Sequence, residues 1–304
     1  MKTLKLLFLI LIFAPLTGCL TVPSSGERLS TADTLAQDAG FHRVRVHTAP
    51  RQDPMSWHDV GENPKFSSAS FLLTAYSKIL EPGKDLHVYI EGDGYAWVTR
   101  NRVSGDPTPR RPVALELAAQ DPAPNVVYLA RPCQYTPMEM NPICEETYWT
   151  DKRFSEEVIG SMNQAIDKFA KDAQSSGVHL IGYSGGGAVA VLVAVRRQDV
   201  KSLRTVAGNL DPNGLNEYHE VSQLDEASLN PMDAAGRLSA IPQYHFIGAN
   251  DPIVPAFIAE HFKERSANET CVRIIKVSNA DHVNGWAENW KELLRVPVVC
   301  GKTS

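Results

Sequence analysis

The sequence predicts an α/β fold in which a mostly parallel central sheet is covered by helices on both faces. Short apolar runs of strand length alternate along the chain with longer segments whose apolar residues recur three or four positions apart. One run, Val178–Tyr183, passes into the apolar segment Ala188–Val195 through a turn of glycines around a single serine. Strands that alternate with helices form right-handed parallel crossovers, and ligands of such sheets lie at the carboxyl ends of the strands.

The strands are predicted from their apolar patterns. Phe41–His47 alternates between apolar and polar residues, whereas Leu86–Ile90 is a mostly apolar run that leads into a glycine-rich loop. In chain order the predicted strands are Phe41–His47, Ser68–Ala75, Leu86–Ile90, Asn125–Pro132, Val178–Tyr183, Leu203–Gly208, Gln243–Asp251 and Cys271–Val277.

The helices are predicted where apolar residues recur at helical spacing. The longest, Phe154–Ala173, places Val158, Met162 and Phe169 on one face. The segment Leu210–Ile241 is irregular and polar, and it is the candidate for a small cap over the site. In chain order the predicted helices are Pro112–Gln120, Phe154–Ala173, Ala188–Val195, Pro255–Arg265 and Trp286–Leu294.

The first residues are typical of an export signal. Lys2 and Lys5 precede an apolar stretch, Leu6–Leu16, that is too short to cross a bilayer as a helix. Leu16–Cys19 resembles the bacterial lipobox, in which a signal peptidase cuts before a cysteine that carries a diacylglycerol. The alternative is an ordinary secretory signal with a chance cysteine, and both imply export. The lipobox implies a signal peptide over residues 1–18, and Leu20 in place of an aspartate implies an outer-membrane lipoprotein that faces the periplasm.

Two further stretches complete the domain organisation. Residues 19–38 are rich in Ser and Thr, and we expect a flexible tether there. Residues 39–304 are predicted to form one domain, because single α/β domains often reach this length. The net charge is −5 with no basic block, which argues against nucleic acid as a partner, since phosphate binding needs clustered Lys and Arg.

Cysteine usage agrees with export. The chain has five cysteines, and four remain besides Cys19. An even number in an oxidising compartment predicts two disulfides. Three pairings are open, and we favour Cys133–Cys144 and Cys271–Cys300 because both close locally. The spacings match no zinc pattern, and we expect no metal and no cofactor.

The glycine turn at Gly182–Gly186 matches the pattern G-x-S-x-G. Between a strand and a helix, this pattern forms a tight elbow in which glycines avoid collisions with neighbouring backbone. Ser184 is then presented above the sheet, and the helix aims its N-terminus at the developing oxyanion. These features predict that Ser184 is a nucleophile.

A serine hydroxyl needs a base, and the base needs an acid that orients it. Among the nine histidines, His282 follows the last predicted strand on a loop at the carboxyl edge of the sheet. Asp251 ends the strand before it, which gives the chain order Ser184, Asp251, His282. Asp211, after an earlier strand, is the rival acid. Asp281 adjoins the histidine, but sequence neighbours rarely orient each other in this way.

The oxyanion needs two hydrogen-bond donors. One is the amide of Gly185, directly after the nucleophile. The other is expected from the Glu91–Gly94 loop that follows the third strand, as the amide of Gly92 or Asp93. We expect the Asp93 carboxylate to point away, because its charge would oppose the oxyanion.

The elbow, the acid, the late histidine and the glycine loop resemble the α/β-hydrolase superfamily over Phe41 to Cys300. With the lipobox and the motifs DPTP, RPCQY and YWTDKRF, the chain is similar to bacterial lipoprotein α/β-hydrolases. The resemblance implies esterase-like or lipase-like chemistry through an acyl-enzyme. Glu91 stands where typical lipases carry a histidine, and this departs from the family pattern.

Long insertions after the strands are expected to select the substrate, a small-molecule or lipid ester. Arg131 either holds an anionic substrate group or forms a structural salt bridge. Aromatic residues either line an acyl pocket or pack the loops onto the sheet, and four arginines either face an envelope anion or are solvated. The alternative functions are a peptidase, an acyltransferase, or an inactive envelope protein that only binds. The aromatic residues are Trp97, Tyr135, Tyr148 and Trp149, and the arginines are Arg100, Arg102, Arg110 and Arg111.

Overall fold

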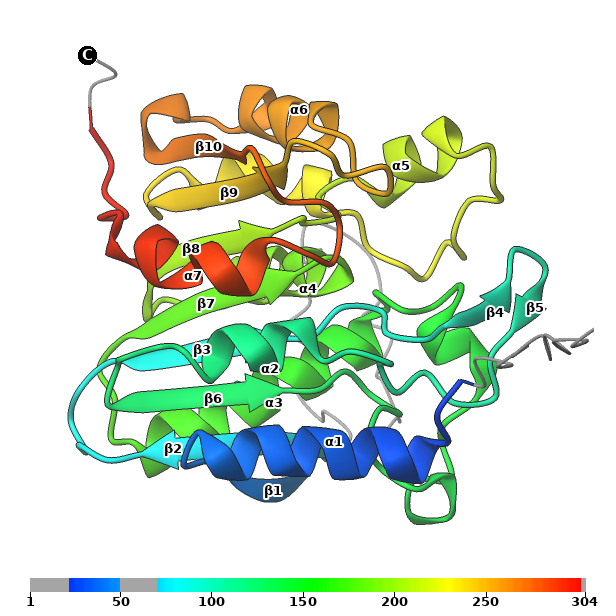
Figure 1. Cartoon of the computed structure of the whole chain (residues 1–304). Coiled ribbons are helices and arrows are strands. Elements are labelled where there is room, and N and C mark those ends of the chain that lie inside the picture. Colours follow the sequence, from blue (N-terminus) through cyan, green and yellow to red (C-terminus); the bar gives the residue numbers. More distant parts are fainter. Residues whose placement is uncertain (1–21, 50–69, 302–304) are drawn as a thin grey trace, which may run out of the picture.

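The computed structural model describes residues 22–49 and 70–301. Within them, eight strands form one sheet in the order β1-β2-β6-β3-β7-β8-β9-β10 (Figure 1). The two pairs β1–β2 and β2–β6 are antiparallel, and all other neighbours are parallel. The strands are β1 (His42–His47), β2 (Leu72–Ile79), β3 (Leu86–Ile90), β6 (Asn125–Leu129), β7 (Val178–Tyr183), β8 (Val200–Val206), β9 (Gln243–Gly248) and β10 (Val272–Val277).

Helices cover both faces of the sheet, and each face has its own apolar core. Helices α1 (Ser25–Asp38), α2 (Val113–Ala118) and α7 (Trp286–Arg295) lie on the face turned to the viewer in Figure 1. Helices α3 (Glu156–Asp172), α4 (Gly185–Ala194) and α6 (Phe257–Arg265) pack into the core of the other face. Every residue of α4 is buried, which explains its composition of glycine, alanine, valine and leucine.

The connections that leave β3 and β7 lead to strands on opposite sides of this central pair. Helix α2 connects β3 to β6 on one side, and α4 connects β7 to β8 on the other. A sheet whose connections diverge in this way opens a crevice at the carboxyl ends of the two strands. The fold predicted from the sequence is therefore confirmed, and it places the glycine elbow and the glycine loop side by side.

The expected tether is wrong for most of its length. The hydroxyl of Ser24 accepts a hydrogen bond from the backbone amide of Glu27. The carboxylate of Glu27 accepts one from the backbone amide of Ser24, and this capping box starts α1. Ala32 and Ala36 are buried against the sheet domain. Arg28 is the third buried residue of α1, so few large apolar residues are buried and the helix is not evident from hydrophobicity.

Two loop predictions also miss local structure. The insertion after β3 contains a hairpin of β4 (Trp97–Thr99) and β5 (Arg102–Val103). The segment expected to be irregular contains α5 (Pro212–Tyr218) and short 3₁₀ turns at Pro231–Asp233 and Ala235–Leu238. Further 3₁₀ turns are Met138–Met140, Glu146–Trp149 and Glu269–Cys271.

Both favoured disulfides, Cys133–Cys144 and Cys271–Cys300, are present. The predicted signal peptide, Cys19 and Leu20 lie outside the described residues, as do the first two residues of the predicted strand Ser68–Ala75. Among the described helices, none combines the length and the apolar character that a bilayer crossing requires.

Candidate active site

Ser184 lies in a strained turn between β7 and α4. Its backbone has φ 50° and ψ −121°, a left-handed conformation that is costly for a residue with a side chain. A Cβ on Gly182 would lie 2.2 Å from the carbonyl oxygen of Gly186, and one on Gly186 would lie 2.3 Å from that of Ile90. Only glycine fits at these two positions, and their close packing holds the serine in its elbow.

The structure brings Ser184, His282 and Asp251 together. Nε2 of His282 lies 3.0 Å from Oγ of Ser184, and Nδ1 lies 3.0 Å from Oδ2 of Asp251. The Asp251 side chain is fully buried, and its Oδ1 accepts the amides of Ile253 and Val254 at 2.8 and 2.9 Å. An ionised carboxylate only accepts, so Nδ1 carries the proton and Nε2 is free to take one from the serine.

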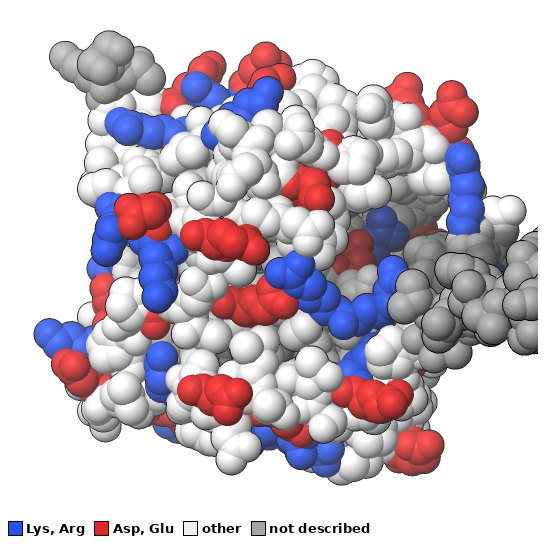
Figure 2. Space-filling view, viewed as in Figure 1, with Lys and Arg blue, Asp and Glu red and all other residues white. Residues whose placement is uncertain are grey.

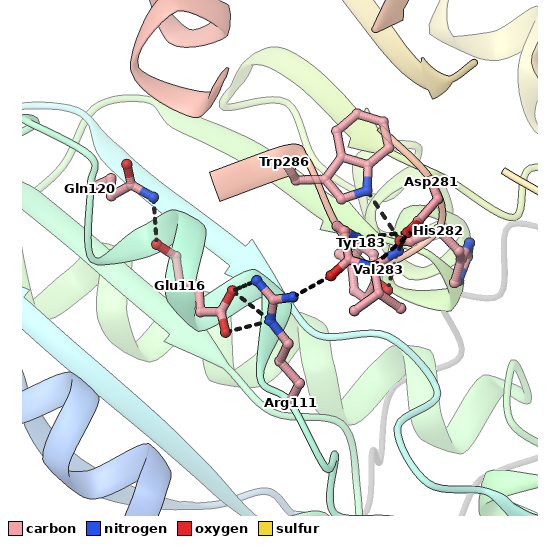
Figure 3. Close-up of polar contacts among 9 residues, drawn as sticks. Arg111, Glu116, Gln120, Tyr183, Asp281, His282, Val283 and Trp286 are labelled. Atoms are coloured by element: carbon pink, nitrogen blue, oxygen red, sulfur yellow. Dashed lines mark hydrogen bonds and ion pairs between the residues drawn. The ribbon is translucent and has the colours of Figure 1, made fainter. Parts of the chain in front are cut away.

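The loop that carries His282 is held through its backbone (Figure 3). The carbonyl oxygen of His282 accepts hydrogen bonds from the Tyr183 hydroxyl at 3.0 Å and from Nε1 of Trp286 at 3.1 Å. Oδ1 of Asp281 accepts the amides of Val283 and of the next residue, both at 2.7 Å. The hydrogen bond from the Asn284 side chain to Oδ2, together with these two amide bonds, lowers the pKa of Asp281. Asp281 therefore shapes the turn and does not orient the imidazole.

Arg111 joins this loop to α2. Its guanidinium forms two parallel hydrogen bonds to the carboxylate of Glu116, and its Nη1 donates to Oδ1 of Asn284 at 2.9 Å (Figure 3). The bond to Glu116 raises the pKa of Arg111. Arg111 thus links helix α2 to the loop that carries His282.

The other arginines of the predicted strip have separate surroundings. Arg100 donates to the carbonyl oxygens of His219 and Glu220, and Arg110 lies over the Tyr95 ring, 4.8 Å from its centroid. Figure 2 shows a row of basic side chains that runs toward a hollow on this face, with acidic side chains close by. The mixture of both signs gives no support to a single anion-binding strip.

The two candidate amides of the glycine loop, those of Gly92 and Asp93, differ in their hydrogen bonds. The amide of Gly92 donates to Oε1 of Glu91 at 2.9 Å and is therefore occupied. In the described part of the chain, the amides of Asp93 and Gly185 have no hydrogen-bond acceptor. Asp93 and Gly185 are thus the pair of free donors beside Ser184.

The Asp93 carboxylate does not point away, contrary to expectation. A Cβ on Gly185 would lie 2.0 Å from Oδ1 of Asp93, so the carboxylate rests directly against this glycine. Arg131 and Arg153 neutralise it, with nitrogen-to-oxygen distances of 3.1 and 3.3 Å. Arg131 therefore forms the structural salt bridge that was one of its two expected roles.

Glu91 is a buried carboxyl group whose importance the sequence did not reveal. It is 1% exposed, and its Oε2 accepts the hydroxyl of Tyr128 at 3.1 Å. Burial raises its pKa to about 7, against the opposing effect of the Gly92 and Tyr128 hydrogen bonds. In sequence, its only signal was a glutamate in the place of a histidine.

In the described part of the chain, the remaining predicted residues form no hydrogen bond with Ser184. Asp211 caps α5, where Oδ1 accepts the amide of Gly214 at 3.1 Å. Tyr135 and Trp149 are buried, and Tyr148 packs edge-on against Phe71, which favours the packing interpretation for these aromatics. Trp97 is 43% exposed on the hairpin. Within the described residues, no group of three His, Cys, Asp or Glu side chains is arranged to hold a metal ion.

Comparisons with known proteins bear on the fold. No protein-family model and no curated protein matches the sequence. The structure is similar to an esterase from Pyrococcus furiosus, with 15% identity and a TM-score of 0.54 over 85% of this chain and 92% of the other. It is also similar to an acylaminoacyl peptidase from Pyrococcus horikoshii, with 11% identity and a TM-score of 0.54 over 87% of this chain and 42% of the other. Est1E from Butyrivibrio proteoclasticus has 13% identity and a TM-score of 0.50 over 74% of this chain and 93% of that protein.

Proposed function

The chain has the α/β-hydrolase fold, and we propose from its site that it is a serine hydrolase of carboxylic esters. The observation that carries the proposal is the hydrogen-bonded series Ser184, His282 and Asp251, with 3.0 Å at each step. The strained elbow presents this serine beside two free amides. In this proposal Ser184 is the nucleophile, His282 its base and Asp251 the orienting acid, and the two amides form the oxyanion site.

In the proposed reaction, Oγ of Ser184 attacks the ester carbonyl while Nε2 of His282 takes its proton. The carbonyl oxygen becomes an oxyanion that accepts hydrogen bonds from the amides of Gly185 and Asp93. Asp251 stabilises the imidazolium, which then donates its proton to the departing alcohol. A water molecule activated by His282 attacks the acyl-enzyme, and the carboxylic acid leaves as Ser184 regains its proton.

Export and lipidation are part of the proposal. Cys19 lies three positions before Val22, the first described residue, so at most about 11 Å of chain separates them. Helix α1 begins at Ser25. Near its start, Arg28 donates to the carbonyl oxygen of Thr108, and its Nη2 lies 3.7 Å from Oδ1 of Asp106. These loop residues follow the hairpin at the carboxyl edge of the sheet. A lipid on Cys19 would hold this edge near the outer membrane in the periplasm, which favours an amphiphilic ester as substrate.

Labelling of the full chain with a fluorophosphonate tests the nucleophile. We expect covalent modification of wild-type protein at Ser184 and none of Ser184→Ala. Absence of labelling, together with no hydrolysis of any p-nitrophenyl ester from acetate to palmitate, would leave the binding-only alternative. Faster turnover of aminoacyl anilides than of esters would favour a peptidase, and product transfer to an added alcohol would favour an acyltransferase.

Metabolic incorporation of labelled palmitate tests the anchor. We expect the label in wild-type protein and its loss in Cys19→Ser, with the variant released from the membrane fraction. Equal release of both proteins on cell fractionation would show an ordinary secretory signal instead.

A further inference from the structure

Gln134 is a buried polar side chain directly behind the glycine loop. It is 1% exposed, and its Nε2 donates to the carbonyl oxygen of Gly92 at 2.9 Å. Its Oε1 accepts the amide of Arg131 at 3.1 Å. Both ends of the side-chain amide are therefore used, and the direction of the Nε2 bond is fixed.

The bond to Gly92 determines where the next amide points. The peptide between Gly92 and Asp93 is planar and trans, so its carbonyl and its N–H point in opposite directions. Because Gln134 binds the carbonyl, the N–H of Asp93 points away from Gln134. This part of the loop packs against the elbow: a Cβ on Gly92 would lie 3.2 Å from Cβ of Ser184, and the Asp93 side chain rests against Gly185.

We propose that Gln134 is a positioning residue that aims the Asp93 amide into the oxyanion site, and that the Cys133–Cys144 crosslink holds Gln134 in place. The proposal rests on the proposed hydrolase function. It assigns to the RPCQY motif an indirect role in catalysis, because Gln134 of this motif acts through the amide of Asp93.

The residues on both sides of Gln134 have an unfavourable backbone conformation, which a crosslink helps to hold. Cys133 and Tyr135 have φ of 70° and 57°, in the left-handed region that residues with side chains seldom adopt. Such a conformation persists only where its surroundings hold it. The amide of Tyr135 donates to Oγ1 of Thr108 at 2.8 Å on one side, and the bond to Cys144 holds the other.

Substitution of Gln134 by Met tests the positioning role, because Met keeps the length and apolar bulk but cannot donate. We expect kcat on p-nitrophenyl butyrate to fall about 10- to 100-fold, since a lost oxyanion donor costs about 10²- to 10³-fold and a misdirected donor keeps part of its effect. KM should stay within about threefold, because the oxyanion forms only in the transition state. A trifluoromethyl ketone, whose adduct carries an oxyanion, should lose affinity by the same factor as kcat/KM.

The matched control is Gln120→Met, which removes a similar bond, from Nε2 of Gln120 to the carbonyl oxygen of Glu116 at 3.3 Å, away from the loop. It should leave kcat and ketone affinity unchanged. Wild-type values of kcat and ketone affinity in folded Gln134→Met would overturn the proposal. If Gln134→Met does not fold, Gln134→Leu, which also cannot donate, gives the same comparison.

The two disulfides provide a second matched pair. Cys133→Ser/Cys144→Ser should lower kcat with little change of KM, at a temperature where circular dichroism shows the variant folded. Cys271→Ser/Cys300→Ser should keep the wild-type kcat when folded. Equal kcat in both folded double variants would overturn the role of the Cys133–Cys144 crosslink.

The hydrolase function and the positioning role fail in different ways. If wild-type protein neither reacts with fluorophosphonate nor hydrolyses an ester, the function itself is wrong. If wild-type protein is active, Ser184→Ala is inactive and Gln134→Met equals the wild type, only the positioning role is wrong.

Discussion

Asn230 donates a hydrogen bond from Nδ2 to Oδ1 of Asp211 at 2.9 Å, and this contact occupies the acid that rivalled Asp251. The same oxygen accepts the amide of Gly214 at the start of α5. An acid used as a helix cap has its oxygens directed at the cap and not at an imidazole. The two aspartates, equivalent in their position after a strand, are thus distinguished by their partners.

Substitution of the two aspartates by Asn should therefore separate their roles. We expect Asp251→Asn to lower kcat by about 10⁴, because the neutral amide no longer favours the tautomer with its proton on Nδ1. Asp211→Asn should leave kcat unchanged and reduce the free energy of unfolding by at most about 1 kcal/mol, since Asn also caps helices. Steady-state kinetics and urea unfolding measure both. A larger loss of kcat in Asp211→Asn than in Asp251→Asn would reverse the assignment.

Glu91 should make stability depend on pH near neutrality. Its pKa of about 7 in the folded chain exceeds the ordinary 4.5, so the folded state holds this proton more tightly. Its stabilising contribution is complete below pH about 4.5 and is lost as pH rises to about 7. The other ionisable groups that affect its pKa are Tyr128 and the carboxylate of Glu116 on α2.

Glu91→Gln removes this titration while it keeps an oxygen for the Gly92 amide. The free energy of unfolding of the variant minus that of the wild type should increase from pH 5 to pH 8. The increase should be up to about 3 kcal/mol, at 1.36 kcal/mol per pKa unit. Urea unfolding of both proteins at the two pH values gives the difference. A pH-independent difference would show that Glu91 does not titrate in this range.

Arg111→Ala should loosen the histidine loop without touching the catalytic groups. The bond to Asn284 is lost, so His282 should spend less time within reach of Ser184, and we expect kcat to fall by about 10-fold. Arg110→Ala is the matched control, because that side chain lies over Tyr95 away from the loop. The comparison uses kcat at saturating ester. If both alanine variants keep the same kcat, the link to α2 has no effect on the loop.

The Cys271–Cys300 disulfide should contribute to stability. Its cysteines are 29 positions apart, and closing a loop of this length lowers the entropy of the unfolded chain enough to stabilise the fold by about 3 to 4 kcal/mol. Cys271→Ser/Cys300→Ser should lose stability of this order in urea unfolding under non-reducing conditions. An unchanged unfolding midpoint would show that this crosslink does not stabilise the folded state.

Much of the fold could be predicted because its signals are local. The run Val178–Tyr183 and the long helix around Met162 follow from the spacing of apolar residues alone. Helix α1 could not be predicted in this way, because its buried residues are one arginine and two alanines, Arg28, Ala32 and Ala36, within a polar segment. Its capping box, Ser24 with Glu27, was the one local signal that would have revealed it.

The site divides along the same line. By itself the sequence determined the elbow at Ser184, the chain order of serine, acid and histidine, and the two local disulfides, because each depends on neighbours or on the strand that comes before it. Only the tertiary structure decided that Asp251 faces His282, that the amide of Asp93 is free, and which side chains hold the loops. Gln134 reaches Gly92 across 42 positions and Arg111 reaches Asn284 across 173. A hydrogen bond needs its atoms within about 3 Å, and for segments so far apart in sequence only the packing of the whole sheet sets that distance.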